Sequence, residues 1–153
     1  MTTLAASHWQ PDVTVATIVA HDGRLLQVEE AIGGALVLNQ PAGHLEPDES
    51  LVEAAVRETL EETGWQVRPT AFIGAYQWKA DNGRHYLRFA FAADPLEHHP
   101  QRPLDTGIVR ALWMTPTELQ SAQPRWRSPL VWRTVADFLA GQRYPLDLLR
   151  QLA

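Results

Sequence analysis

Apolar and β-branched residues alternate with glycine-containing turns near the start of the chain. Residues 12–20 (DVTVATIVA) are rich in valine and threonine, which favours a buried strand. A turn at residues 21–23 leads into a second apolar run at residues 24–29, so the two runs predict a β-hairpin. A pair of glycines then marks another turn before a third predicted strand at residues 35–39.

The pattern changes to helical spacing after this point. Residues 40–48 contain two prolines and a glycine, and we expect them to form a loop. Residues 49–63 predict a helix, and Gly64 is placed to end it. The apolar face expected to pack on the core consists of Leu51, Val52, Ala55, Val56 and Leu60.

The second half of the chain returns to strands and ends in helices. Further strands are predicted at residues 66–79, 86–93 and 108–114. Residues 81–83 form the turn between the first two, and residues 94–107 are expected to form a long loop. Helices are predicted to begin at Thr115-Pro116 and Ser128-Pro129, the second running to about residue 140. This mixture predicts an α/β (α+β) fold in which one mixed sheet lies between helices.

Length and composition predict a single domain spanning residues 1–153. The net charge of −5 argues against a general surface for nucleic-acid polymers, which would need a basic patch. The chain has no cysteine, so disulfides, thiol nucleophiles and Cys-bound zinc are excluded. No apolar run approaches the ~18 residues of a membrane span, and the N-terminus lacks the features of a secretory signal. We therefore expect no membrane partner and a cytoplasmic location.

Three glutamates crowd into the last turns of the predicted helix. Glu58, Glu61 and Glu62 fall within one turn, where like charges three or four positions apart each cost roughly 0.2–0.5 kcal/mol. They also oppose the negative end of the helix dipole. Pairs of Arg57 with neighbouring glutamates on a solvated face would not account for the whole set. A divalent cation would, because Mg²⁺ and Mn²⁺ prefer carboxylate oxygens.

Residues 43–65 resemble the Nudix box, the signature of the Nudix hydrolase family. The box is written G-x5-E-x7-R-E-U-x-E-E-x-G-U, with U a bulky apolar residue. The one departure is Thr59, where the family usually has an aliphatic residue, and this change touches packing rather than chemistry. The residues that match in type and spacing are Gly43, Glu49, Arg57, Glu58, Glu61, Glu62, Gly64 and Trp65.

The resemblance implies a Nudix-type α/β/α sandwich and Mg²⁺-dependent hydrolysis of a phosphoanhydride bond, with Mn²⁺ able to replace Mg²⁺. Arg57 would pair with one of the box acids and fix its position, and Glu49 would steady the preceding loop. The implied metal ligands are Glu58, Glu61, Glu62 and a main-chain carbonyl of Ala42 or Gly43.

The resemblance leaves the general base open. Glu58 or Glu61 would take the proton from water. In some family members the base lies outside the box, and Asp105 or Glu97 could add a further carboxylate to the metal. Sequence position alone does not decide between these acids.

Segments outside the box resemble one subgroup of the family, the NudJ phosphatases. They include residues 39–46, 127–131 and 141–146, and the likeness runs from about residue 9 to residue 147. The resemblance implies a small-molecule diphosphate substrate: nucleoside tri- and diphosphates, thiamine pyrophosphate, or its hydroxymethylpyrimidine precursor. It leaves open whether the protein is a monomer or a homodimer.

Several side chains are candidates for binding the substrate. Trp78 and Trp9 could stack on a base, which is worth about 1–3 kcal/mol, but packing explains a tryptophan equally well. Arg88 lies on the opposite side of its strand from Leu87 and Phe89, where it would bind a phosphate or form a surface salt bridge. His44 follows the box glycine and would contact the phosphate, or simply be solvated.

Two other functions are weighed against hydrolysis. A non-catalytic Nudix-fold module that binds or senses a nucleotide often has a broken box, whereas the box acids are complete here. Isomerisation of isopentenyl diphosphate commonly uses a cysteine, which this chain lacks. The sequence therefore favours a hydrolase.

Overall fold

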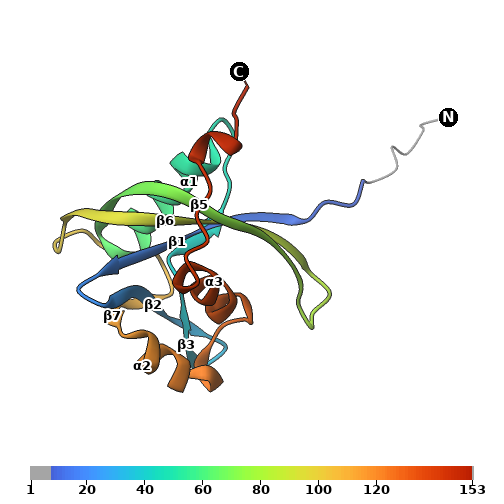
Figure 1. Ribbon diagram of the computed structural model, residues 1–153. Helices are drawn as coiled ribbons and strands as arrows, with labels where there is room; N and C mark the ends of the chain where they lie inside the picture. The colour runs from blue at the N-terminus through green and yellow to red at the C-terminus, as the bar shows by residue number, and fades with distance from the viewer. Residues whose placement is uncertain (1–7, 153) are drawn as a thin grey trace.

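The computed structural model describes residues 8–152, which form a seven-stranded sheet flanked by helices (Figure 1). The strands are β1 (Asp12–His21), β2 (Arg24–Ile32), β3 (Ala35–Asn39), β4 (Ala42–His44), β5 (Trp65–Lys79), β6 (His85–His98) and β7 (Ile108–Met114). The helices are α1 (Leu51–Thr63), α2 (Pro116–Ser121) and α3 (Leu130–Leu139), with short 3₁₀ turns η1 (Gln123–Arg125) and η2 (Leu146–Leu148).

The sheet is mixed, as predicted, and β1 is its central strand. β1 pairs in parallel with β6, and in antiparallel fashion with β2 near one end and with β4 near the other. The order along the sheet is β3-β2-β1-β6-β5, with β7 on β2. The edge of β5 that faces away from β6 pairs with Tyr144 of the C-terminal segment, through two backbone hydrogen bonds to Phe72, each 2.8 Å long.

Helices α1 and α3 pack on opposite faces of this sheet (Figure 1). Strand alternation sends Phe72 into the cluster beneath α1 and its neighbour Ile73 into the cluster beneath α3. Val15 likewise faces α1, whereas Ile18 faces α3. The observed architecture is the predicted sandwich of a mixed sheet between helices.

Parts of two segments that were predicted to be loops form β-strands in the structure. Residues 42–44, expected within a loop, form β4 because they pair with Thr14–Ala16 of β1. The strand predicted at residues 86–93 continues to His98, because Trp65 and Gln66 of β5 pair with the residues expected to form a loop. Both errors concern pairing with distant segments, which local composition does not reveal.

The face of α1 was predicted only in part. Leu51 and Val52 are half-buried against the core, but the fully buried positions are mostly polar. Thr59, the departure from the Nudix box, has no exposed surface, and its hydroxyl lies 2.8 Å from the hydroxyl of Thr17 on β1. The buried residues of α1 are Ala54, Ala55, Glu58, Thr59, Glu62 and Thr63.

The ends of α1 have identifiable caps. The helix begins at Leu51 rather than at residue 49, because the Ser50 hydroxyl accepts a hydrogen bond from the backbone N–H of Glu53. The Glu53 carboxylate in turn accepts one from the N–H of Ser50. Gly64 ends the helix as predicted, in the left-handed conformation with φ of 73°.

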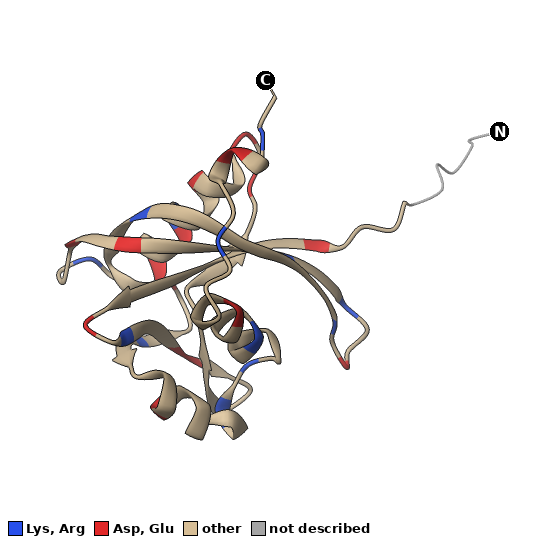
Figure 2. Ribbon diagram, viewed as in Figure 1, with Lys and Arg blue, Asp and Glu red and all other residues tan. Residues whose placement is uncertain are grey.

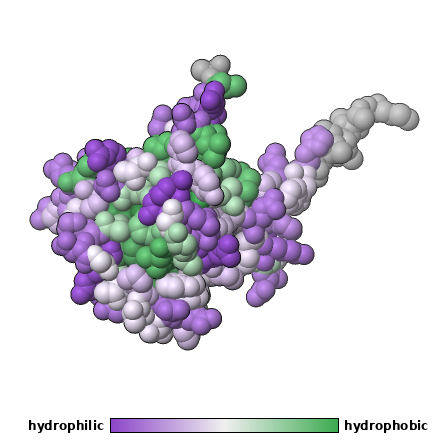
Figure 3. All heavy atoms as spheres, in the orientation of Figure 1, coloured by the Kyte–Doolittle hydropathy of each residue, from purple (hydrophilic) through white to green (hydrophobic). Residues whose placement is uncertain are grey.

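The surface carries both charge signs on many elements. Lys and Arg positions are spread over strands, helices and loops (Figure 2). The face seen in Figure 3 is largely hydrophilic, with hydrophobic residues gathered near its middle. Among residues 8–152, no helix is long and apolar enough to cross a membrane.

We predict that Ser50→Ala lowers the free energy of unfolding by about 1 kcal/mol, because it removes one half of a reciprocal cap. Urea unfolding of both proteins measures the difference. Ser121→Ala, at the exposed last position of α2, is the control. Equal losses in the two variants would show that the Ser50 cap contributes nothing specific.

Candidate active site

The site begins where α1 meets β4 with no space between them. A Cβ atom added at Gly43 would lie 2.0 Å from Cδ of Glu58, which is far inside van der Waals contact. A larger residue at this position would displace the Glu58 carboxylate, so glycine is needed here because of the carboxylate rather than because of the backbone conformation. The Nudix-box glycine therefore lets the Glu58 carboxylate lie directly against the strand.

Arg57 connects the acids of this region to each other and to β4. Its guanidinium donates two hydrogen bonds to Glu49, at 2.7 and 3.0 Å, and one to Glu58 at 2.9 Å. It also donates to Glu61 at 3.2 Å and to the carbonyl of His44 at 3.0 Å. Glu49 accepts a further bond from the N–H of Glu46, so the loop before α1 is tied to the same group. Hydrogen bonding to the Glu49 carboxylate, with Arg57 as the donor, is the largest cause of the raised pKa of Arg57, which is fully charged.

Three carboxylates converge beside Arg57. One oxygen from each of Glu58, Glu61 and Asp105 lies within 4.8 Å of the other two, and we call these residues the acid cluster. Burial raises the pKa of Glu58, and the charges of Glu61 and Asp105 add to this effect against the opposing pull of Arg57. Three oxygen donors at this spacing are the chemistry that Mg²⁺ and Mn²⁺ prefer.

Asp105 reaches the cluster because its loop is attached to the end of α1. Its backbone N–H donates to the carbonyl of Glu61 at 3.0 Å, and the N–H of His99 donates to that of Gly64 at 2.8 Å. These bonds satisfy carbonyls that a helix end leaves without partners. Glu97, the other acid considered from the sequence, is exposed and lies 3.8 Å from His99, outside the cluster.

Glu62 lies apart from the acid cluster. Its Oε1 accepts a hydrogen bond of 2.7 Å from the backbone N–H of Ala42 on β4. Burial raises the pKa of this carboxyl to about 8, and the charges of Glu30 and Glu58 also favour the protonated form. Glu62 thus connects α1 to β4 through this hydrogen bond. Its second oxygen makes no hydrogen bond to the described residues.

A pocket of about 390 Å³ lies along β4, and we call it the β4 pocket. Ala42 and Gly43 line it, so β4, against which the Glu58 side chain of α1 packs, forms a wall of the pocket. Three of the four substrate-binding candidates also line it, all but Trp9: Trp78, Arg88 and His44. The structure therefore brings together residues that lie far apart in the sequence.

These three side chains differ in how firmly they are held. Trp78 is half-buried and stacks on Tyr86, with ring centroids 5.4 Å apart. His44 is exposed and lies 3.2 Å from Asp12. Arg88 is only 7% exposed and donates to the side-chain carbonyl of Gln40 at 3.3 Å, so it is not a surface salt bridge. Trp9 is 70% exposed and packs edge-on against His85, outside the pocket wall.

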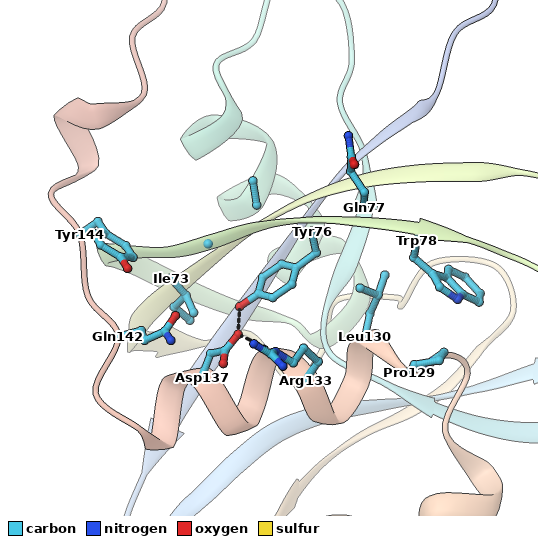
Figure 4. Close-up of a pocket in the computed structure, with 12 residues that line it drawn as sticks. Ile73, Tyr76, Gln77, Trp78, Pro129, Leu130, Arg133, Asp137, Gln142 and Tyr144 are labelled. Atoms are coloured by element: carbon cyan, nitrogen blue, oxygen red, sulfur yellow. Dashed lines mark hydrogen bonds and ion pairs between the residues drawn. The ribbon is translucent and has the colours of Figure 1, made fainter.

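A second cavity, of about 540 Å³, lies between β5 and α3 (Figure 4). Tyr76 donates a hydrogen bond of 2.7 Å to Asp137 there, and Arg133 donates to the same carboxylate oxygen at 3.1 Å. Trp78 and Leu130 line both cavities. The acid cluster lines neither cavity, but Gly43 lines the β4 pocket and lies directly against the Glu58 carboxylate, so we place the chemistry at β4.

Comparison with known proteins finds a family model and relatives that match most of the chain. The family model for the NUDIX domain matches residues 8–135. Phosphatase NudJ of Escherichia coli (strain K12) is 45% identical over 141 residues, which cover 92% of this chain and 92% of the relative.

Solved structures extend the similarity to three dimensions. A NUDIX hydrolase from Nitrosomonas europaea is 48% identical, with a TM-score of 0.92 and coverage of 94% of this chain and 98% of that one. A UDP-X diphosphatase, 16% identical, superposes with a TM-score of 0.72 over 93% of this chain and 69% of its own. At that identity the likeness concerns the fold alone.

We predict that Gly43→Ala weakens binding of Mn²⁺ by about 10²-fold, because the new methyl group must displace the Glu58 carboxylate. Isothermal titration with MnCl₂ measures the affinity. Gly74→Ala is the matched control, since its Cβ would meet only the end of Tyr76, at 3.2 Å. Unchanged Mn²⁺ affinity in a folded Gly43→Ala protein would rule out a cation beside Glu58.

We also predict a pH effect that can be traced to Glu62. Between the unfolded pKa of 4.5 and the folded pKa of about 8, the folded protein holds a proton that the unfolded chain has released. The metal-free protein should therefore lose stability as pH rises through this window. Glu62→Gln removes the titration, so its unfolding free energy should fall less from about pH 5 to pH 8, by at least ~1 kcal/mol.

Urea unfolding in EDTA at several pH values makes this comparison. Added Mg²⁺ should reduce the loss in the wild-type protein, because bound cation favours the charged carboxylates. Parallel pH profiles for the two proteins would contradict the raised pKa of Glu62.

Proposed function

Because this chain belongs to the Nudix hydrolase family, an enzyme family that acts on phosphoanhydrides, we propose that it is a Mg²⁺-dependent hydrolase of small-molecule diphosphates. The convergence of Glu58, Glu61 and Asp105 against the glycine of β4 carries this proposal. The set combines two box acids with one acid from a distant loop, which a merely solvated helix face would not assemble.

The donor set fits a hard divalent cation. We propose that Glu58, Glu61 and Asp105 bind Mg²⁺, together with the free oxygen of Glu62 and a main-chain carbonyl of Ala42 or Gly43. When bound, Mg²⁺ would neutralise charge on the diphosphate and lower the pKa of a bound water. Mn²⁺ offers the same coordination chemistry and is expected to substitute.

The protein's own side chains then have distinct roles. Arg57 holds Glu58 and Glu61 in place through hydrogen bonds of 2.9 and 3.2 Å. Glu58 or Glu61 accepts the proton from the attacking water. Arg88 pairs with a phosphate oxygen in the β4 pocket, where His44 also contacts the substrate.

The substrate range follows the relatives and the pocket. Similarity to Phosphatase NudJ supports the release of phosphate. We propose nucleoside tri- and diphosphates, thiamine pyrophosphate and the pyrophosphate of its hydroxymethylpyrimidine precursor as the substrates. The Trp78–Tyr86 stack supports an aromatic ring as the organic group, because bases and pyrimidines stack on such surfaces. We propose that the whole chain acts as one such domain in the cytoplasm.

We predict that Glu58→Gln, Glu61→Gln and Asp105→Asn each lower kcat for nucleoside triphosphate hydrolysis by roughly 10²–10⁴-fold. Each substitution removes a charge from the acid cluster while keeping the size of the side chain. Phosphate release with Mg²⁺, and again with excess EDTA, measures the rates. A panel of nucleotides and thiamine pyrophosphate in which no compound is hydrolysed in an EDTA-sensitive way would contradict the proposal that the protein is a metal-dependent hydrolase.

Glu97→Gln is the control for Asp105→Asn. It removes a charge from the same segment, but its carboxylate lies outside the acid cluster. Its kcat should stay within about twofold of wild type, as expected for a surface change away from the site. Equal losses in both variants would mean that Asp105 acts through general charge only.

A further inference from the structure

The β4 pocket contains an unusual concentration of unsatisfied polar atoms. Among the described residues, four buried side-chain polar atoms lack a hydrogen-bond partner, and three of them belong to residues that line this pocket. Buried polar atoms nearly always have partners, so unpartnered donors in this wall favour an acceptor ligand. Two of the three atoms can donate, Oγ1 of Thr14 and Nε of Arg88, whereas Oδ1 of Asn39 is an acceptor and gives no support for an anion.

Strand register places two of these residues side by side. Thr14 of β1 is the direct partner of Arg88 on β6, and on its other side it is the partner of His44 on β4. Side chains of direct partners project from the same face of a sheet. Gln40 holds Arg88 in this row: its oxygen accepts from the guanidinium, while its amide donates to the carbonyl of Val131.

Three arginines line the pocket, and none of its described lining residues is an aspartate or glutamate, although the chain as a whole has a net charge of −5. Two of the arginines have carboxylate partners: Arg84 pairs with Asp12, and Arg127 pairs with Glu30. Arg88 has no such partner among the described residues, and its Nε makes no hydrogen bond. Burial lowers the pKa of Arg88 to about 10, and the charge of Arg127 adds to this effect against the opposing charges of Glu62 and Glu30. An anion beside Arg88 would stabilise its buried charge.

We infer that the β4 pocket contains an anion subsite in which Arg88, Arg127 and Thr14 bind a phosphate group other than the phosphate held at the acid cluster. The guanidinium groups and the hydroxyl can all donate to phosphate oxygens, and arginine matches phosphate geometry well. The inference deepens the proposed function and rests on it for the identity of the substrate. The preferred substrate then carries an additional phosphate, either in a triphosphate chain or on its organic group.

Binding of inorganic phosphate in excess EDTA tests the subsite without any turnover. Titration calorimetry, or ¹⁵N-labelled arginine side-chain spectra, should detect saturable binding to the wild-type protein. Arg88→Gln should weaken it by about 10–100-fold, the range for losing a charge-assisted hydrogen bond. Arg133→Gln, in the cavity between β5 and α3, is the control and should bind phosphate as wild type does.

Arg127 needs a paired variant, because removing it alone leaves Glu30 buried without its partner. Glu30→Gln with Arg127→Gln keeps a neutral pair and should lose phosphate affinity. Glu30→Gln alone should increase the affinity several-fold, because it releases Arg127 from its carboxylate. A purely structural role for Arg127 would not produce this opposite pair of effects. Equal phosphate affinity in all folded variants would overturn the inference.

Kinetics then identify where the additional phosphate lies. The ratio of kcat/KM for a nucleoside 5′-triphosphate over its 5′-diphosphate should fall in the paired variant if the phosphate belongs to the chain. The same ratio for a ribose-phosphorylated 5′-diphosphate over the plain one should fall if it belongs to the organic group. Phosphate binding without chelator-sensitive hydrolysis would sink the proposed function and leave the subsite standing, whereas hydrolysis with no phosphate binding in EDTA would sink the subsite alone.

Discussion

The close approach of α1 to β4 is the constraint on which the whole site depends. Glu58 occupies the space that a side chain at position 43 would need, so the strand and the carboxylate define each other's positions. The strand itself is only three residues long and is held by β1. Arg57 then joins α1, the preceding loop and β4 through one guanidinium. The site is therefore connected through β4 to β1 at the centre of the sheet.

Electrostatics divides this region into two parts. Acids converge on the α1 side of β4, and arginines line the pocket on the side where β1 and β6 present Thr14 and Arg88. A bound group is attracted or repelled by the side chains nearest to it, and the net charge of the chain does not determine which of the two occurs. The negative overall charge of −5 thus says little about the local field that a phosphate would meet.

Local patterns predicted most of the fold, because strand alternation and helical spacing are short-range signals. β4 could not be predicted in this way, since Ala42–His44 has no periodicity of its own and becomes a strand only beside β1. The face of α1 was misjudged for a related reason: Glu58, Thr59 and Glu62 are buried by specific polar contacts, which an apolar count cannot find. A capping box at Ser50 and Glu53 was readable and would have corrected the start of the helix.

For the candidate site, the sequence predicted the residues of the box, and their roles remain predictions. Spacing identified the box residues, but the choice of Asp105 over Glu97 depends on a loop attached to the carbonyl of Glu61. Alternation placed Arg88 on the far side of its strand from Phe89, yet only the packed structure shows that this side is covered. The position of Asp105 and the burial of Arg88 both depend on contacts between segments far apart in the chain, which a single sequence does not reveal.

The pairing of Tyr144 with Phe72 affects the outer edge of the sheet. β5 is the outermost strand at its end of the sheet, and the outward backbone groups of such a strand can pair with a strand from a neighbouring chain. Tyr144 takes up two of these groups with backbone hydrogen bonds of its own. At Phe72, therefore, the edge has no free N–H or carbonyl with which to extend the sheet.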